Sequence, residues 1–195
     1  MGRAKEFDPD TALDAAMDVF WRKGYEATSM EDLVDHLGIG RASIYATFGN
    51  KHELYLKALQ RYREGDPVVQ RLSQPGSAVA AIRALLHDRV EDILADPDRK
   101  GCFAVNTAVE CLPGDEQLTH QVGSAWNTAE IALTSALYRA QAQGELAADK
   151  NPRELGRFLV TVLEGLYVLA KVPDPQRLRD AAHVALSILE SAPPV

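Results

Sequence analysis

The chain has 195 residues, 46 % of them hydrophobic, which is enough to build a sizeable core. We expect a cytoplasmic protein with no membrane partner, because the N-terminus has no apolar signal-peptide region and no apolar stretch is long enough to span a bilayer. The two cysteines, Cys102 and Cys111, fit neither a disulfide framework nor a zinc-binding pattern, so neither a metal nor a cofactor is expected.

The formal net charge of −7 argues against a strongly basic nucleic-acid-binding protein. The acidity is uneven, however: residues 1–63 carry nine Lys or Arg and ten Asp or Glu, whereas residues 64–195 carry twelve and eighteen. A nearly neutral N-terminal region can bind DNA if its few cations face the phosphates. Charge alone therefore does not exclude a DNA-binding protein.

Hydrophobic residues recur at helical spacing along almost the entire chain, and no long alternating strand pattern occurs. The chain is therefore predicted to be all-α, with about nine helices. These helices are expected at about residues 9–23, 30–37, 41–48, 51–64, 78–94, 102–112, 115–143, 152–170 and 175–191. The Gly-, Pro- and Ser-rich segment 65–77 is expected to be a boundary between two regions.

Start and stop signals support the first four helices. Ser, Asp and Asn side chains favour helix N-caps, and glycine favours helix ends. The expected N-caps are Asp8, Ser29 and Asn50, and the expected stops are Gly24 and Gly38.

Residues 29–51 read SMEDLVDHLGIGRASIYATFGNK, which predicts two short helices separated by a tight turn that contains glycine. This arrangement is typical of a helix-turn-helix. The first helix supports the second, and the second presents its N-terminal residues to the major groove of double-stranded DNA.

Residues 11–62 resemble the DNA-binding domain of the TetR/AcrR family of transcriptional regulators. The resemblance rests on the segments ALDAAMDVFWRKGYEATSMEDL and LGIGRASIYATFGNKHELYLKAL, and above all on the string Tyr45-x-x-Phe48-x-x-Lys51 followed by Leu54. It implies a homodimeric repressor, not an enzyme, that releases a palindromic operator when a small-molecule effector binds.

The resemblance also implies how the chain is divided. An N-terminal helix-turn-helix domain of three helices covers residues 1–50, and a connecting helix covers 51–64. A C-terminal helical domain for ligand sensing and dimerisation covers 65–195.

Roles in DNA binding follow from the same resemblance. Base contacts are expected from Arg41, Ala42, Ser43 and Ala46. Phosphate contacts are expected from Thr28, Ser29, Tyr45, Thr47 and Lys51. Arg41 is the best candidate for direct readout, because arginine pairs bidentately with guanine. Arg3 and Lys5 are candidates for a flexible arm beside the DNA. The family often has Ser where Gly40 stands and a larger contact residue where Ala46 stands.

Family members pair through their last two helices, and the sequence supports such a face. Both helices are more apolar than one buried stripe requires. The apolar positions are Leu155, Leu159, Val162, Leu163, Leu166, Leu169 and Ala170, then Leu178, Ala181, Ala182, Ala185, Ile188 and Leu189. The alternative is that these residues form the core of a monomer.

An effector pocket in such a body is expected to combine aromatic, apolar and a few polar groups. The candidates are Cys102, Phe103, Asn106, Glu110, Trp126, Tyr138, Phe158 and Tyr167. Each of them can alternatively be ordinary core.

Cys102 is a candidate reactive thiol. The segment GCFAVNTAVE resembles a stretch in a TetR/AcrR subgroup whose cysteine senses electrophiles or oxidants. The basic residues Arg99 and Lys100 and a helix start would lower its pKa. The alternative is a small buried hydrophobe. A disulfide to Cys111 is not expected, because nine helical residues separate the two by about 13 Å, on opposite faces.

Two other functions stay open on the residues alone. One is a small-molecule-binding protein whose helix-turn-helix no longer binds an operator. The other is a thiol enzyme that uses Cys102 with His120 as its base. Neither the sign of regulation nor the operator sequence can be read from the chain. His36 and His52 are expected on solvated faces.

Overall fold

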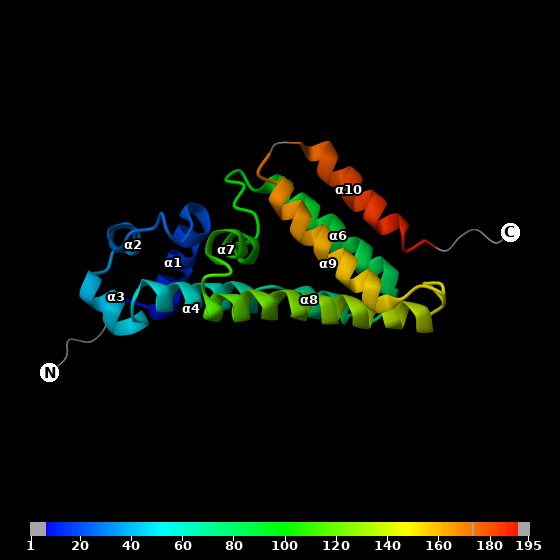
Figure 1. Ribbon diagram of the computed structural model, residues 1–195, viewed down its shortest axis with the longest axis horizontal. Helices are drawn as coiled ribbons and strands as arrows, with labels where there is room; N and C mark the ends of the chain where they lie inside the picture. The colour runs from blue at the N-terminus through cyan, green and yellow to red at the C-terminus, as the bar shows by residue number, and fades with distance from the viewer. Residues whose placement is uncertain (1–6, 173, 191–195) are drawn as a thin grey trace. The chain divides into compact units, whose positions relative to one another are not determined.

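The computed structural model describes residues 7–172 and 174–190, and all of its regular structure is helical. Within these residues there are ten helices (Figure 1): α1 (Pro9–Lys23), α2 (Met30–Leu37), α3 (Arg41–Phe48), α4 (Lys51–Glu64), α5 (Val68–Leu72), α6 (Ala78–Ala95), α7 (Phe103–Cys111), α8 (Glu116–Ala142), α9 (Pro152–Leu169) and α10 (Pro175–Ser187). The prediction of an all-α fold is confirmed. Arg3 and Lys5 lie outside the described residues.

The helices agree closely with the predicted ones, with two differences. The boundary segment contains α5, a helix of five residues, which the sequence did not predict. Helix α10 ends at Ser187, before the predicted end at 191, and 191 itself lies outside the described residues. None of the helices in the described residues combines the length and apolar character that crossing a membrane requires.

The chain forms two compact units. The N-terminal unit contains α1–α4, α7 and the first turns of α8, over residues 7–66 and 103–123. The C-terminal unit contains α5, α6, the remainder of α8, α9 and α10, over residues 67–102 and 124–190 apart from 173.

Side-chain caps start the helices of the N-terminal unit as expected. The Asp8 carboxylate accepts the N–H groups of Asp10 and Thr11 at the start of α1. Ser29 and Asn50 each form a capping box at the starts of α2 and α4. These caps hold short helices that would be marginal alone.

Aromatic rings fill the core of the N-terminal unit. Tyr55 of α4 lies at its centre and packs edge-on against Phe20, Tyr25 and Phe103, with centroids 4.9, 4.9 and 5.2 Å away. The Tyr55 hydroxyl lies 2.8 Å from the hydroxyl of Thr107 in a buried hydrogen bond. Side chains of α7 therefore form part of the same core as the helix-turn-helix region.

Aliphatic side chains fill the core of the C-terminal unit. Helices α6, α9 and α10 pack side by side, as Figure 1 shows. One cluster joins α5, α6, α8, α9 and α10 through residues such as Ile82, Leu86, Leu133 and Leu159, and a second surrounds Val90 and Leu166. Helices α8 and α9 approach closely at Gly156, where a Cβ atom would lie 2.4 Å from the Thr134 hydroxyl.

Candidate functional site

Helix α3 presents one face to the interior and its N-terminal tip to solvent. Ile44 and Phe48 are 0 % and 4 % exposed, whereas Tyr45 is 44 % exposed. The exposed tip consists of Arg41, Ala42, Ser43, Tyr45 and Ala46. All four residues predicted to contact bases thus lie on the exposed side of α3.

The turn before α3 makes this orientation possible. Gly38 adopts the left-handed conformation, with φ 65° and ψ 20°, so the chain reverses sharply after α2. Gly40 occupies the N-cap of α3 and provides no side-chain hydrogen bond to it. The Ser43 N–H donates to the Gly40 carbonyl at 2.8 Å, and no N-cap side chain stands between the start of α3 and an anion such as phosphate.

The C-terminal end of α3 is attached to α4. The Lys57 ammonium donates to the carbonyl of Phe48 at 2.6 Å. A cation at a helix C-terminus also offsets the partial negative charge there. Sequence reasoning missed Lys57, because its acceptor is a backbone carbonyl that no sequence pattern identifies.

Lys51 is the first residue of α4 and is half-buried. Its ammonium lies 4.3 Å from the centroid of the Tyr25 ring, within the range of a cation–π contact. The Asn50 side chain caps the same helix start by accepting the N–H of Glu53 at 3.0 Å. Lys51 therefore combines a fixed cation with a helix N-terminus, which is a favourable site for a phosphate.

Two of the three Ser and Thr hydroxyls predicted to touch phosphates make hydrogen bonds inside the protein. Thr28 is buried, and its hydroxyl donates to the carbonyl of Gly24 at 2.6 Å. The Ser29 hydroxyl donates to Asp32 at 2.8 Å. The Thr47 hydroxyl is buried, with no hydrogen-bond partner among the described residues. Of the predicted phosphate contacts, Tyr45 and Lys51 are the better placed.

An ion pair lies at the start of α2. Lys23 contacts the Asp32 carboxylate at 2.6 Å, and this hydrogen bond, with those from Ser29, holds the pKa of Asp32 well below its ordinary range. The Asp32 carboxylate thus occupies the Ser29 hydroxyl and backbone N–H that a phosphate would otherwise contact.

The effector candidates on α7 lie in the N-terminal unit. Phe103 is fully buried in the aromatic core, and Asn106 is half-buried. Glu110 is exposed, and its carboxylate accepts the N–H groups of Tyr25 and Glu26 at 2.9 and 2.8 Å. Phe103 and Glu110 thus have structural contacts to the helix-turn-helix region, which the sequence did not predict.

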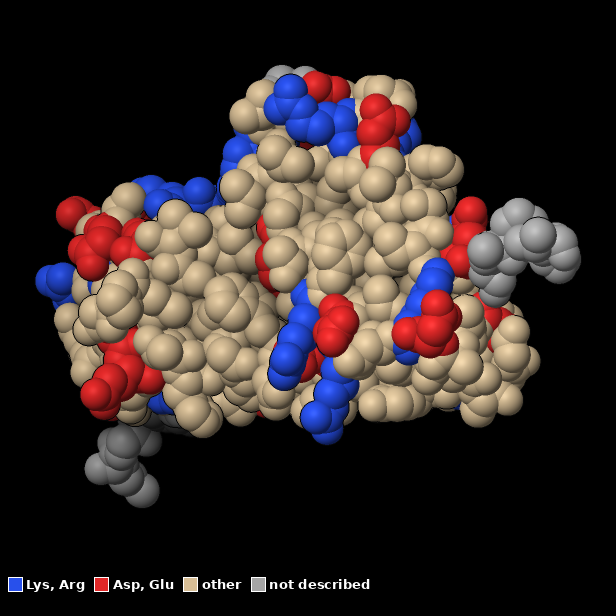
Figure 2. Space-filling view, turned by 45° about the vertical axis from the view of Figure 1, so that its right-hand side comes forward, with Lys and Arg blue, Asp and Glu red and all other residues tan. Residues whose placement is uncertain are grey.

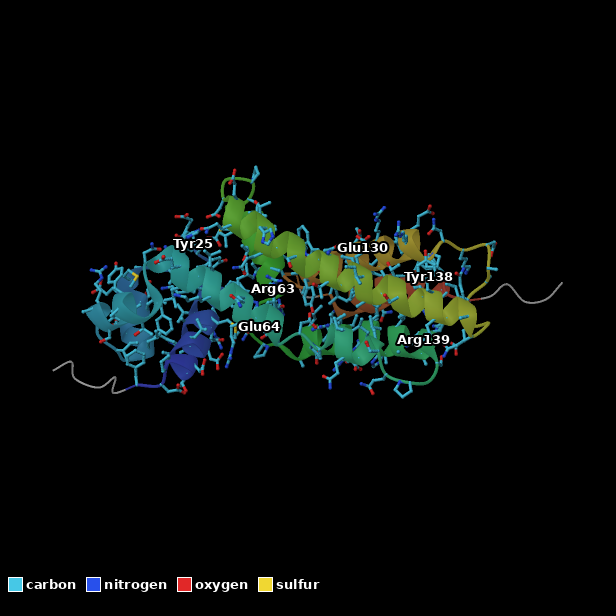
Figure 3. All side chains as sticks on the ribbon, turned by 90° about the horizontal axis from the view of Figure 1, so that it is seen from below. Tyr25, Arg63, Glu64, Glu130, Tyr138 and Arg139 are labelled. Atoms are coloured by element: carbon cyan, nitrogen blue, oxygen red, sulfur yellow. The ribbon has the colours of Figure 1, made fainter. Side chains whose placement is uncertain are left out.

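The effector candidates of the C-terminal unit differ in exposure. Tyr138, labelled in Figure 3, is 51 % exposed, and Phe158 is 44 % exposed. Trp126 and Tyr167 are half-buried. The indole N–H of Trp126 is buried and has no acceptor among the described residues, so it is available to a ligand or a water molecule.

The two cysteines are not joined to each other, in agreement with the helical geometry. Cys102 is 6 % exposed. Burial, reinforced by the nearby carboxylates of Glu110 and Glu26, raises the pKa of Cys111 to about 11. Cys111 is therefore a poor nucleophile at neutral pH.

His52 differs from its expected place on a solvated face. It is half-buried, and its Nε2 atom lies 2.5 Å from the Asp115 carboxylate. A hydrogen bond from the Leu118 N–H, with the contact to His52, lowers the pKa of Asp115. The two partners are 63 positions apart, so no local pattern in the sequence indicates this pair.

A surface hollow of about 380 Å³ lies beside α4 and the start of α8. Its lining residues are Leu56, Glu116, Gln117, His120 and Gln121, and none of the predicted effector residues is among them. In the part of the chain that the structure describes, no three His, Cys, Asp or Glu side chains come together as metal ligands.

Two sequence families match this chain. Residues 12–58 match the family described as "Bacterial regulatory proteins, tetR family", and residues 78–186 match "Tetracyclin repressor-like, C-terminal domain". The chain is 42 % identical over 195 residues to the uncharacterized HTH-type transcriptional regulator YezE of Bacillus subtilis (strain 168), covering 97 % of this chain and all of that protein.

Two further relatives support the same comparison. The chain is 31 % identical to the HTH-type transcriptional repressor ComR of Escherichia coli (strain K12), over 87 % of this chain and 82 % of that protein. Among solved structures, the TetR family regulator CifR, a cysteine mutant complexed with 26-bp operator DNA, superimposes with a TM-score of 0.84. It is 34 % identical, and the alignment covers 95 % of this chain and 98 % of that one. These names confirm the expectation of a regulator rather than an enzyme.

Proposed function

Because this chain belongs to the TetR family of bacterial transcriptional regulators, we propose that it is a homodimeric repressor that releases a palindromic operator when an effector binds. The observation that carries this proposal is the exposed tip of α3, whose buried side is fixed by Ile44 and Phe48. A short helix held outward in this way is what insertion into a major groove requires.

Base readout is assigned to the tip of α3. Arg41 is exposed at the first position of the helix, where its guanidinium can reach guanine O6 and N7. Ala42, Ser43 and Ala46 provide small surfaces that let α3 approach the bases closely. Tyr45 and Lys51 then contact phosphates on either side. The CifR complex with operator DNA supports this assignment by similarity.

The homodimer is assigned to α9 and α10. One face of α9 carries Phe158, Thr161, Gly165 and Val168, spaced three or four residues apart and partly or fully exposed. Gly165 has open space where a Cβ would be, so another helix can approach it closely. Val184 of α10 is 63 % exposed.

Apolar surface of this kind on a soluble domain favours association. Wide areas of the surface carry neither acidic nor basic side chains (Figure 2). Most of the apolar positions expected to form the dimer face, such as Leu159, Leu166 and Ala185, are buried inside the subunit. Pairing two copies through α9 and α10 would instead cover the exposed Phe158, Val168 and Val184. It would also create the two-fold symmetry that a palindrome needs, with recognition helices about 34–36 Å apart.

The effector is assigned to the C-terminal unit. The buried, unsatisfied indole N–H of Trp126 favours a ligand with a hydrogen-bond acceptor. A ligand releases the operator only by binding one conformation of the dimer more tightly than the other.

Cys102 is assigned as a thiol that reacts with electrophiles such as quinones. It follows Arg99 and Lys100, whose carbonyls accept hydrogen bonds from Lys171 at 3.1 and 2.7 Å. In this proposal the neighbouring basic residues favour the thiolate, and a local opening admits the quinone, because Cys102 is only 6 % exposed. The thiolate sulfur would add to a ring carbon of the quinone, forming one C–S bond and moving an electron pair to one oxygen, which takes a proton from water. Transfer of the hydrogen on the attacked carbon to the other oxygen then restores the aromatic hydroquinone.

DNA binding and assembly can be tested together. We expect the purified protein to sediment as a dimer and to shift a duplex that contains the DNA upstream of its own gene, but not a scrambled duplex of the same composition. A monomer at working concentration, or equal binding to both duplexes, would contradict the proposal. Dimerisation without DNA binding would favour the small-molecule-binding alternative.

The thiol assignment has its own experiment. After mild treatment with a quinone, mass spectrometry should find one adduct on Cys102 and none on Cys111. Operator binding should fall in the treated protein and persist in treated Cys102→Ser protein. An unmodified Cys102, or a normal response of Cys102→Ser, would end this part of the proposal.

A further inference from the structure

Glu110 joins two parts of the N-terminal unit that are far apart in sequence. It lies near the end of α7, and each of its carboxylate oxygens accepts one backbone N–H, from Tyr25 at 2.9 Å and from Glu26 at 2.8 Å. The partners are 85 and 84 residues away along the chain. Hydrogen bonds to a charged acceptor are stronger than those between neutral groups.

The two N–H groups belong to the turn that connects α1 to α2. Gly24 begins this turn with φ 85° and ψ 173°, a conformation that residues with side chains rarely adopt. A Cβ atom at Gly24 would lie 2.8 Å from the Glu110 carboxylate, so only glycine permits the contact. The Thr28 hydroxyl closes the same turn by donating to the Gly24 carbonyl at 2.6 Å.

This turn also supports Lys51, the candidate for phosphate binding. The Tyr25 ring lies 4.3 Å from the Lys51 ammonium and packs against the Tyr55 ring at 4.9 Å. Tyr25 is labelled in Figure 3, and its contact with Tyr55 places it against α4. Fixing the backbone of Tyr25 therefore limits where the Lys51 ammonium can lie.

Helix α7 is itself firmly held. Phe103 at its start is fully buried, and Thr107 one turn later makes the buried hydrogen bond to Tyr55. Glu110 thus extends from a fixed helix rather than from a mobile loop, which is the condition for a side chain to position another element.

We propose that Glu110 is a positioning residue for operator binding. Its carboxylate holds the turn between α1 and α2 and, through Tyr25, places Lys51 on a DNA phosphate. The inference rests on the proposed function and extends it, because Glu110 itself touches no DNA in this assignment.

The sign of the effect separates positioning from simple charge. A carboxylate in a DNA-binding unit repels phosphates, so its removal should tighten binding if charge were its only influence. Loss of the clamp should weaken binding instead. The two explanations therefore predict opposite changes for Glu110→Gln, which keeps the size of the side chain.

The experiment compares Glu110→Gln with Glu116→Gln, which makes the same charge change at an exposed position of α8. Fluorescence anisotropy with the duplex from upstream of the gene gives Kd over a range of salt concentrations. We expect Glu110→Gln to bind about ten-fold more weakly, with a salt slope smaller by about one for each half-site, because one phosphate contact is lost. Glu116→Gln should bind as the unchanged protein does, or slightly more tightly.

Hydrogen exchange tests the two hydrogen bonds of Glu110 directly, first in the unchanged protein and then in Glu110→Gln. The amides of Tyr25 and Glu26 should be protected, and in Glu110→Gln they should exchange at least ten-fold faster. Tighter or equal DNA binding by Glu110→Gln overturns the proposal, as does a lower melting temperature with Kd and salt slope unchanged. Failure of the unchanged protein to bind its upstream DNA would refute the proposed function instead, whereas unprotected amides would refute the clamp alone.

Discussion

The two units of this chain bury different kinds of side chain. The N-terminal unit contains a connected set of rings: Phe20, Trp21, Tyr25, Tyr55, Tyr62 and Phe103. The C-terminal unit is filled by Leu, Ile, Val and Ala side chains from five helices. Edge-to-face ring pairs favour particular geometries, whereas aliphatic cores tolerate rearrangement. The ring-filled unit carries the tip of α3 that we propose reads DNA, and the aliphatic unit is where we propose the effector binds.

The largest expected effect tests whether α7 belongs to the aromatic unit. Phe103→Ala removes a fully buried ring and should lower the free energy of unfolding by about 3–5 kcal/mol. Hydrogen exchange should accelerate mainly in α1 and α4. As the matched change, Leu133→Ala should cost about 2–5 kcal/mol and accelerate exchange in α6 and α9. The reverse distribution would show that the two units are wrongly divided.

The next prediction concerns a substitution that should weaken DNA binding and leave the stability of the fold unchanged. Arg41→Ala should weaken operator binding by about 1–3 kcal/mol for each half-site, because a bidentate contact to guanine is lost. The melting temperature should not change, since Arg41 is exposed. Arg153→Ala, which removes an exposed arginine from the C-terminal unit, is the control for charge. Equal losses in the two variants would mean that Arg41 acts only through net charge.

Substitutions at two N-caps, one in each unit, should cost the same free energy of unfolding and so allow the units to be compared. Asn50 and Ser77 each accept one backbone N–H at 3.0 Å, at the starts of α4 and α6. Each substitution by alanine should cost about 1 kcal/mol in thermal unfolding. Only Asn50→Ala should also weaken operator binding, because it loosens the helix start that carries Lys51. Weaker binding by Ser77→Ala would argue against this separation.

The smallest effect is a pH dependence confined to the N-terminal unit. The pKa of Asp115 is lowered by the Leu118 N–H and by His52. Its contribution to stability is therefore complete above the ordinary value of 3.8 and is lost as the pH falls through the lowered pKa. Asp115→Asn should flatten acid unfolding in this range, measured by circular dichroism. Asp149→Asn, an exposed change in the C-terminal unit, should leave the profile unaltered.

The same contrast explains what could be predicted from the sequence. Helices α3 and α4 have the predicted bounds, because Asn50 and the neighbouring glycines mark their ends locally. The exposed tip of α3 was predicted as well, since the spacing of Ile44 and Phe48 fixes its buried side. These features depend on residues within a few positions of each other.

Contacts across long sequence separations could not be predicted. The sequence predicts Glu110 as a pocket residue, and nothing near it in sequence indicates that it accepts the N–H groups of Tyr25 and Glu26. The exposure of Tyr138 and Phe158 was equally hidden, because helical periodicity identifies an apolar face but not whether that face lies inside the subunit or on its surface. The effector residues therefore stay predictions. The helix-turn-helix could be predicted from local sequence alone, whereas an effector pocket depends on contacts between distant segments.

The bond from Lys57 to the Phe48 carbonyl has a consequence for how operator preference can evolve. It secures α3, the proposed recognition helix, through a main-chain atom that every residue type possesses. The outward positions from Arg41 to Ala46 can therefore be exchanged while this attachment is retained. New DNA sequences become accessible by rewriting a handful of codons, and the same property makes the tip a suitable place to graft another regulator's specificity.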